Sequence, residues 1–133
     1  LNTLENDGEV ILDKKLVKNI LLNLLSNAIK YSGENQSIIC NVELRPKHMV
    51  MIVEDHGIGV PEHEQDKLFQ RFFRAQNAAN IQGTGLGLSI IKSYVELMSG
   101  NIEYTGAENK GSTFVVTLPR NMVSTKSLGS KLV

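Results

Sequence analysis

A broad apolar stripe near the start of the sequence most strongly limits what this chain can fold into. Between Asp13 and Gly33, large apolar side chains recur at the three- and four-residue spacing of an α-helix. The stripe consists of Leu16, Val17, Ile20, Leu21, Leu24, Leu25, Ala28 and Ile29. A helix with so wide an apolar face must bury it against another layer of structure. Asp13 suits the N-cap of this helix, and Gly33 suits its stop.

Strand-like segments that follow can supply the second layer. Residues 37–44 alternate between apolar and polar side chains, which predicts a half-buried strand with a buried thiol at Cys40. Its apolar face would consist of Ile38, Cys40, Val42 and Leu44. A turn then leads to an apolar run at 49–54, which suits a central strand.

The remaining chain alternates helical and strand patterns. In order, it predicts a short helix near 62–68 opened by Pro61, a flexible loop over 75–84, a long helix over 86–98 closed by Gly100, and strands near 101–106 and 113–118. Long helices beside such strands indicate an α/β fold, a two-layer sandwich in which helices cover one face of a mixed sheet.

The length of 133 residues suits one domain. We expect a linker or frayed start over 1–8, a domain over 9–119 and a mobile tail over 120–133. Because the sequence begins with leucine, we expect a fragment or a processed product.

Composition narrows the class of function. Lysine plus arginine equals aspartate plus glutamate at 14 each, so the net charge of zero argues against nucleic acid as a partner. A single cysteine excludes a disulfide framework within the chain. No apolar stretch approaches the roughly 20 residues of a membrane helix, so we expect a cytoplasmic domain.

Polar residues interrupt the first helix at regular spacing. Asn23 and Asn27 share a face, and Lys30 and Tyr31 follow one turn later. The amide oxygen of Asn27 suits Mg²⁺, a hard cation that keeps most of its waters. Lys30 suits a phosphate. The alternative is that the two asparagines only decorate a solvated face.

Two glycine-rich stretches indicate close backbone approaches. In VEDHGIGVP, residues 53–61, Asp55 ends a strand just before Gly57 and Gly59, and its carboxylate can accept a hydrogen bond from an exocyclic amine. A plain glycine turn is the alternative. GTGLGL, residues 83–88, runs into the second long helix, whose amide N–H groups favour an anion even without the lysine of a phosphate loop. A glycine hinge is the alternative there.

The segment LFQRFFRA, residues 68–75, joins aromatic and basic residues. We expect the phenylalanines at 69, 72 and 73 to anchor the base of the following loop. Arg74 borders that loop, so we favour it over Arg71 as the arginine that points to a phosphate. The three histidines, at 48, 56 and 63, have no metal-ligand spacing and are expected on the surface.

In combination and in this order, these motifs resemble the boxes of the sensor histidine kinase catalytic domain. That domain belongs to the GHKL or Bergerat-fold superfamily, which includes gyrase, mismatch-repair ATPases and a heat-shock chaperone. LLNLLSNAIKYS resembles the asparagine box, EDHGIGVP the first glycine box, LFQRFFRA the phenylalanine box and GTGLGLSIIKSYVELMSG the second glycine box. The resemblance extends to GSTFVVTLP, the closing strand, and spans about residues 10–119.

The resemblance implies that ATP and Mg²⁺ are the cofactors and assigns each box residue a role. Asn27 would bind the metal, Asn23 would assist near the phosphates, and Lys30 and Arg74 would contact phosphate. Tyr31 would pack on adenine, and Asp55 would accept from its amino group in a pocket shaped by Gly57 and Gly59. The remaining nucleotide contacts would come from Gly83, Thr84, Gly85, Leu86, Gly87, Leu88 and Ser112.

The resemblance also implies a kinase rather than a hydrolase. Hydrolases of the superfamily carry a glutamate as water-activating base four residues before the metal-binding asparagine, and here that position is Asn23. The acceptor histidine would lie on a separate helical phosphoacceptor domain, with a response regulator as indirect partner. We expect this fragment to be a monomer and its parent, which in this family is often membrane-anchored, to be a homodimer. The alternatives are a serine kinase of the anti-sigma type and an interaction module that does not use ATP.

Overall fold

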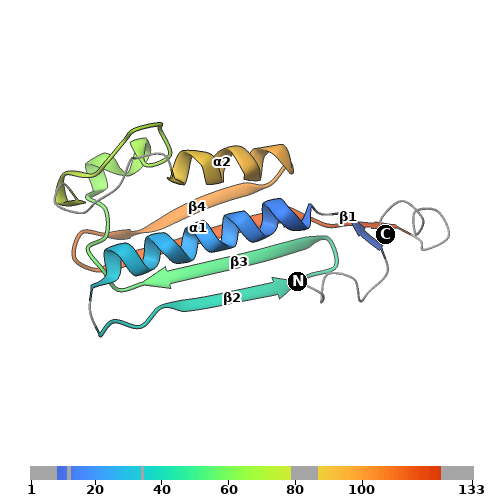
Figure 1. The fold of residues 1–133 in the computed structure, drawn as a ribbon, viewed down its shortest axis with the longest axis horizontal. Helices are drawn as coiled ribbons and strands as arrows, with labels where there is room; N and C mark the ends of the chain where they lie inside the picture. Colours follow the sequence, from blue (N-terminus) through green and yellow to red (C-terminus); the bar gives the residue numbers. More distant parts are fainter. Residues whose placement is uncertain (1–8, 12, 34, 79–86, 124–133) are drawn as a thin grey trace.

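Two long helices cover one face of a four-stranded sheet (Figure 1). The computed structural model describes residues 9–11, 13–33, 35–78 and 87–123. The strand order is β2–β3–β5–β4, and the helices α1 and α2 pack on each other. The predicted two-layer α/β sandwich is confirmed. All three strand pairings in this sheet are antiparallel, however, whereas the sequence suggested a mixed sheet.

Helix α1, Lys14–Ser32, forms as the apolar stripe predicts. Its N-cap is Asp13, whose carboxylate accepts hydrogen bonds from the backbone amides of Lys15 and Leu16 at 3.0 and 3.1 Å. It ends at Gly33, where φ is 73°. The face of α1 that is turned to the sheet is buried and consists of Val17, Ile20, Leu24 and Ala28.

Strand β3, His48–Asp55, is the central strand that the apolar run predicts. It lies between β2 and β5, and its buried Met51 and Val53 are paired with Val116 and Phe114 of β5. The resulting core joins α1, β3, β5 and α2. Asp55, the last residue of β3, is thereby carried to the same end of the molecule as the last turn of α1 (Figure 1).

Strand β2, Ile39–Leu44, is more exposed than its pattern predicts. The predicted alternation is present, since Cys40 and Val42 are paired with the core residues Val53 and Met51. The Cys40 side chain is nevertheless exposed, so the prediction of a buried thiol was wrong. The physical reason is that β2 is an edge strand, while α1 packs on β3 and β5 and α2 packs on β4.

A second, two-stranded sheet extends past the predicted C-terminal domain boundary at residue 119. Strand β1, Glu9–Ile11, pairs antiparallel with β6, Asn121–Val123, which the sequence placed in a mobile tail. Arg120 is also buried there and donates through Nη1 to the Arg45 carbonyl at 2.6 Å. Strands of three residues are too short to show a period, which is why the pattern missed them. Residues 1–8 and 124–133 lie outside the described residues.

The other predicted elements are present, with small shifts at their ends. They are the 3₁₀ helix η2, Glu62–Lys67, the helix α2, Gly87–Leu97, and the strands β4, Asn101–Ala107, and β5, Gly111–Pro119. The short 3₁₀ helix η3, Gln76–Ala78, lies in the segment that was predicted to be a loop. The buried Glu64 carboxylate accepts from the Gln76 amide at 3.2 Å and so joins η2 to η3. The predicted loop is therefore partly ordered at 76–78, and its part from 79 to 84 lies outside the described residues. In the described chain, neither helix has the length and apolarity to cross a membrane.

Candidate functional site

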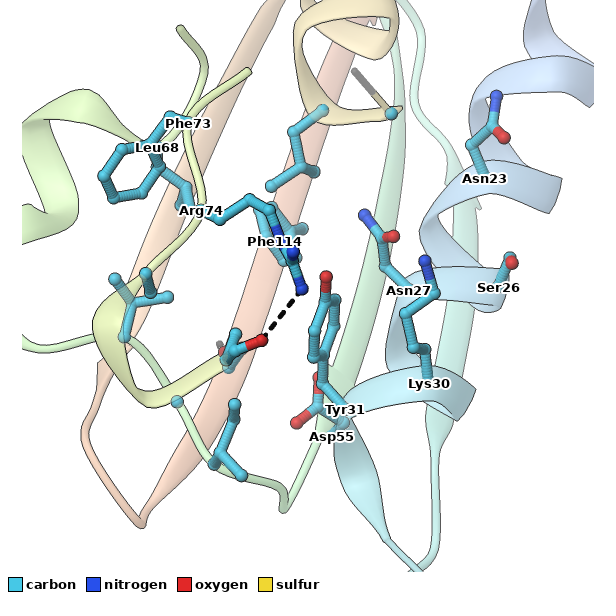
Figure 2. Close-up of a pocket in the computed structure, with 18 residues that line it drawn as sticks. Asn23, Ser26, Asn27, Lys30, Tyr31, Asp55, Leu68, Phe73, Arg74 and Phe114 are labelled. Atoms are coloured by element: carbon cyan, nitrogen blue, oxygen red, sulfur yellow. Dashed lines mark hydrogen bonds between the residues drawn. The ribbon is translucent and has the colours of Figure 1, made fainter. Parts of the chain in front are cut away.

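A cavity of about 220 Å³ opens where the last turns of α1, the end of β3, the segment after η2 and the start of α2 meet (Figure 2). Its lining includes ten of the predicted site residues, namely Asn23, Asn27, Lys30, Tyr31, Asp55, Gly59, Arg74, Gly87, Leu88 and Ser112. Asn23 and Ser112, which are 89 positions apart in the sequence, are thus brought to one place by the fold.

The helix α1 contributes a polar wall. Asn23, Asn27 and Lys30 come from successive turns of α1, and Tyr31 projects toward the middle of the cavity (Figure 2). The Asn27 amide oxygen faces the start of α2, since a Cβ placed on Gly87 would lie 3.9 Å from it. The Lys30 ammonium lies 5.7 Å from the centroid of the Tyr31 ring. These polar side chains and the first turn of α2 therefore share one end of the cavity.

Asp55 forms the acidic floor of the cavity. Only 5% of the residue is exposed, and its Oδ1 accepts from the Gly57 amide at 2.9 Å. Burial raises the pKa of the Asp55 carboxyl above its ordinary value of 3.8, while hydrogen bonds from the backbone amides of Gly57 and Ser112 act in the opposite direction. Asp55 is therefore a buried hydrogen-bond acceptor, and any further donor would stabilise its ionised form.

The first glycine pair allows the chain to pass close to two other segments. A Cβ on Gly57 would collide with the Tyr31 carbonyl, and one on Gly59, where φ is 63°, would collide with the Ala107 carbonyl. The Ile58 amide donates to the Tyr31 carbonyl at 3.2 Å. Gly59 lines the cavity. Gly57 lies outside the described lining, where its amide donates to the Asp55 carboxylate and its Cα packs against the last turn of α1.

The phenylalanine box divides between core and surface. Phe69 and Phe73 pack against the core, as expected, and Phe69 meets Phe114 edge to face with 6.3 Å between ring centroids. Phe72 is instead 65% exposed at a positive φ of 65°, so its predicted anchoring role was wrong. The turn at Phe72 directs its ring to solvent, where the Arg71 guanidinium lies 5.4 Å from the ring centroid.

Arg74 reaches across the cavity from the side opposite α1 (Figure 2). Its Nη2 donates to the Ala78 carbonyl at 3.0 Å, which holds the side chain against η3. Arg71 is not among the described lining residues. Of the second glycine box, Gly87 and Leu88 line the cavity at the start of α2, and Gly83, Thr84, Gly85 and Leu86 lie outside the described residues.

The sequence did not single out several residues that line the cavity. They are Ser26, Ile58, Val60, Leu68, Ala75, Ala78 and Phe114, to which Phe73, expected only as an anchor, is added. Ser26 lies three residues after Asn23 on α1, so helical spacing could have found it. Phe114 could be placed in the cavity only once the sheet register is known. It lies two residues after Ser112 and therefore on the same face of β5.

Histidine, cysteine and carboxylate side chains do not form a metal site in the part of the chain that the structure describes, where no three of them gather. His48, His56 and His63 are exposed, as the sequence predicts. The Asn27 amide makes no hydrogen bond to the described residues, so its oxygen is available to a ligand in the cavity. One amide oxygen beside an anion site suits Mg²⁺, which takes few protein ligands and completes its shell with waters and phosphates.

A buried carboxylate, a polar helix wall and a helix N-terminus around one cavity are typical of a nucleotide-binding α/β sandwich. Residues 12–122 match the family of the histidine kinase-, DNA gyrase B-, and HSP90-like ATPases, and the chain belongs to this family. It is the sensor-kinase type of that ATP-binding domain.

Several similar proteins are histidine kinases. The circadian input-output histidine kinase CikA of Synechococcus elongatus is 40% identical over 109 residues, which cover 80% of this chain and 14% of CikA. The sensor histidine kinase WalK of Bacillus subtilis is 35% identical over 122 residues, 89% of this chain and 20% of WalK. The structure of a mycobacterial sensor histidine kinase, MprB, superposes with a TM-score of 0.76 at 30% identity, and the match covers 86% of this chain and 78% of the chain in that structure. This chain thus spans a fifth or less of the length of CikA and WalK.

Proposed function

We propose that this chain binds Mg-ATP and donates the γ-phosphoryl group to a histidine on a separate helical domain, as part of two-component signal transduction. The observation that carries the proposal is the cavity itself, with one buried carboxylate at its floor and amides, a lysine and a helix N-terminus at its other end. A nucleoside triphosphate has the matching polarity, a base with an amino donor at one end and an anionic tail at the other.

In this proposal the adenine lies at the Asp55 end. Its amino group donates to the Asp55 carboxylate, and its faces contact Tyr31, Ile58 and Val60, which line the same region. The close packing at Gly57 and Gly59 shapes this part of the cavity. A hydrogen bond to a charged acceptor contributes about 1.5–3 kcal/mol.

The phosphates lie between α1 and the start of α2. The amides at the N-terminus of α2, near Gly87 and Leu88, favour an anion there. Lys30 and Arg74 approach from opposite sides and add positive charge (Figure 2). Asn27 holds Mg²⁺ with Asn23 beside it, and the ion, when bound with the nucleotide, neutralises charge that develops on the phosphates.

Transfer to a protein acceptor is favoured over hydrolysis by the side chains at the phosphate end. Asp55 is the only carboxylate among the described lining residues, and it lies at the floor instead of beside Asn27. Water near the phosphates therefore lacks a general base in the described lining. Phosphoryl transfer depends mainly on positioning and charge stabilisation, so the acceptor and its acid can be supplied by another domain.

The partners follow from this chemistry. A helical phosphoacceptor domain docks at the phosphate end, a response regulator receives the phosphoryl group afterwards, and the parent protein dimerises through the helical domain. The fragment itself is a cytoplasmic monomer in this proposal, and its domain over residues 9–119 is extended by strand β6, which pairs with β1.

The test is an incubation of the purified chain with ATP labelled at the γ- or the α-phosphorus, alone and with helical histidine phosphoacceptor domains. We expect no labelling of the chain and slow phosphate release when it is alone. With an acceptor, we expect label from the γ position only, on a product that is stable in alkali and labile in acid. Efficient labelling of the chain's own histidines, label on serine, or rapid hydrolysis without an acceptor would each contradict the proposal.

A further inference from the structure

The side chain of Tyr104 lies directly behind the base end of the cavity. Tyr104 belongs to β4 and does not line the cavity in the described part of the chain, but its hydroxyl lies 2.9 Å from Ser112 Oγ, which does. Its ring packs on Phe114, another lining residue, with 5.1 Å between centroids. Burial raises the pKa of the Tyr104 phenol, so it keeps its proton at neutral pH.

The hydrogen bonds of the Tyr104 hydroxyl favour one direction for its proton. The Val60 backbone amide donates to it at 3.1 Å, so the oxygen acts as an acceptor on that side. The remaining partner is Ser112 Oγ, and either of the two hydroxyls can donate in that contact. If Ser112 donated, the half-buried phenol would have no described acceptor for its own proton, which is unfavourable. Donation from Tyr104 to Ser112 satisfies the phenol and leaves the Ser112 proton at the cavity, where a ligand or water can accept it.

The neighbours of Tyr104 hold this arrangement in place. Gln65 Nε2 donates to the Val60 carbonyl at 3.0 Å and to the Gly106 carbonyl at 3.1 Å, so the Val60 peptide is held on both sides. A Cβ on Gly106 would lie 2.5 Å from the Tyr104 hydroxyl oxygen, so the glycine leaves the space that this oxygen needs.

We propose that Tyr104 is a positioning residue that turns Ser112 into a hydrogen-bond donor toward the base, and so selects a purine with an acceptor at N1. Because Ser112 Oγ accepts from Tyr104, its own proton points into the cavity. Ser112 is paired with Asp55 across β5 and β3, so one base edge meets an acceptor at Asp55 and a donor at Ser112. Adenine presents an amino donor and the N1 acceptor side by side, whereas guanine and hypoxanthine present an oxygen and an N1–H. If a water lay between them, it would accept from Ser112 and donate to N1, so N1 would still have to be an acceptor.

This inference rests on the proposed binding of ATP, and its test uses affinity ratios. Calorimetry measures the dissociation constants of ATP, 1-deaza-ATP and 7-deaza-ATP for the wild type, Tyr104→Phe, Ser112→Ala and Ser112→Thr. The wild type should bind 1-deaza-ATP about tenfold more weakly than ATP, because the Ser112 proton loses its acceptor. In Tyr104→Phe, the serine hydroxyl can turn away, so the ratio should fall to about twofold. The phenylalanine ring preserves the packing on Phe114.

The control measurements separate a loss of Ser112 orientation from a general weakening of ATP binding. A ratio of two affinities within one variant cancels any loss of folded protein. Ser112→Ala should bring the ratio close to one, Ser112→Thr should restore it, and 7-deaza-ATP should bind all four proteins as ATP does. If Tyr104→Phe kept the full ratio while Ser112→Ala lost it, the serine would orient without Tyr104 and the inference would be overturned. If the wild type bound no ATP, the proposed function would fail first.

Discussion

Replacing Gly57 with alanine tests how closely the nucleotide loop packs on α1. The backbone φ at Gly57 is ordinary, but an added Cβ would collide with the Tyr31 carbonyl and lie 2.6 Å from the Ser32 Cα. Both atoms belong to the last turn of a helix and cannot rotate away. The loop must therefore move, and the 3.2 Å hydrogen bond from the Ile58 amide to the Tyr31 carbonyl is lost.

The expected loss of stability can be worked out from these contacts. Overpacking of this kind costs about 1–3 kcal/mol, and the lost hydrogen bond costs about 1 kcal/mol more. We therefore expect Gly57→Ala to lower the free energy of unfolding by about 2–4 kcal/mol. In urea denaturation with a slope near 2 kcal/mol per molar, the midpoint should fall by about 1–2 M. ATP affinity should fall about tenfold, because the Gly57 amide supports the Asp55 carboxylate.

Gly33 provides a matched control without the collision. Unlike Gly57, Gly33 has a φ that other residues rarely adopt, at 73°, but a Cβ there would meet nothing within 4 Å. Gly33→Ala should therefore cost only the backbone strain, about 1–3 kcal/mol, and leave ATP affinity unchanged. An unfolding midpoint and an ATP affinity of Gly57→Ala equal to those of the wild type would refute the reasoning.

Three further predictions concern the site and the edge strand. Asn27→Ala should remove the Mg²⁺ dependence of ATP affinity and leave the Mg²⁺-free affinity near that of the wild type, as measured by calorimetry; an unchanged Mg²⁺ dependence would place the ion elsewhere. ATP affinity should decrease as the pH falls through the raised pKa of Asp55, above 3.8, because the protonated carboxyl is a poorer acceptor, and Asp55→Asn should lack this dependence. The same shift means that Asp55 favours the folded state most below pH 3.8 and that this contribution is lost as the pH rises through the raised value. Cys40 should react with a thiol reagent in the native protein nearly as fast as in urea, whereas strong protection would show that β2 is covered.

The parts of the fold with a long hydrophobic period could be predicted from the sequence. The helix α1 was found with both of its ends because Asp13, the apolar stripe and Gly33 agree. The central position of β3 followed from its apolar run. By contrast, the exposure of Cys40 depends on which strands the helices cover, and the direction of Phe72 depends on one turn. Neither is encoded in a local pattern.

The site could be predicted where motifs carry chemistry and not where the fold alone supplies contacts. Asn27, Asp55 and Arg74 stand out by residue type beside glycines or on a helix face, and the structure brings all three to one cavity. Phe114 and Tyr104 are ordinary strand residues in the sequence. Only the register of β4 on β5 places Tyr104 beside Ser112, so their shared hydrogen bond could not be anticipated.

The most direct test of the central claim is a calorimetric titration of ATP into the purified chain, with and without Mg²⁺, beside the Asp55→Ala variant. Loss of a hydrogen bond to a charged acceptor should weaken binding by about 1.5–3 kcal/mol, which is about tenfold to a hundredfold. We predict measurable binding by the parent chain, tighter with Mg²⁺, and this loss in the variant. Absence of ATP binding by a folded parent chain, or equal affinity in the two proteins, would contradict the account.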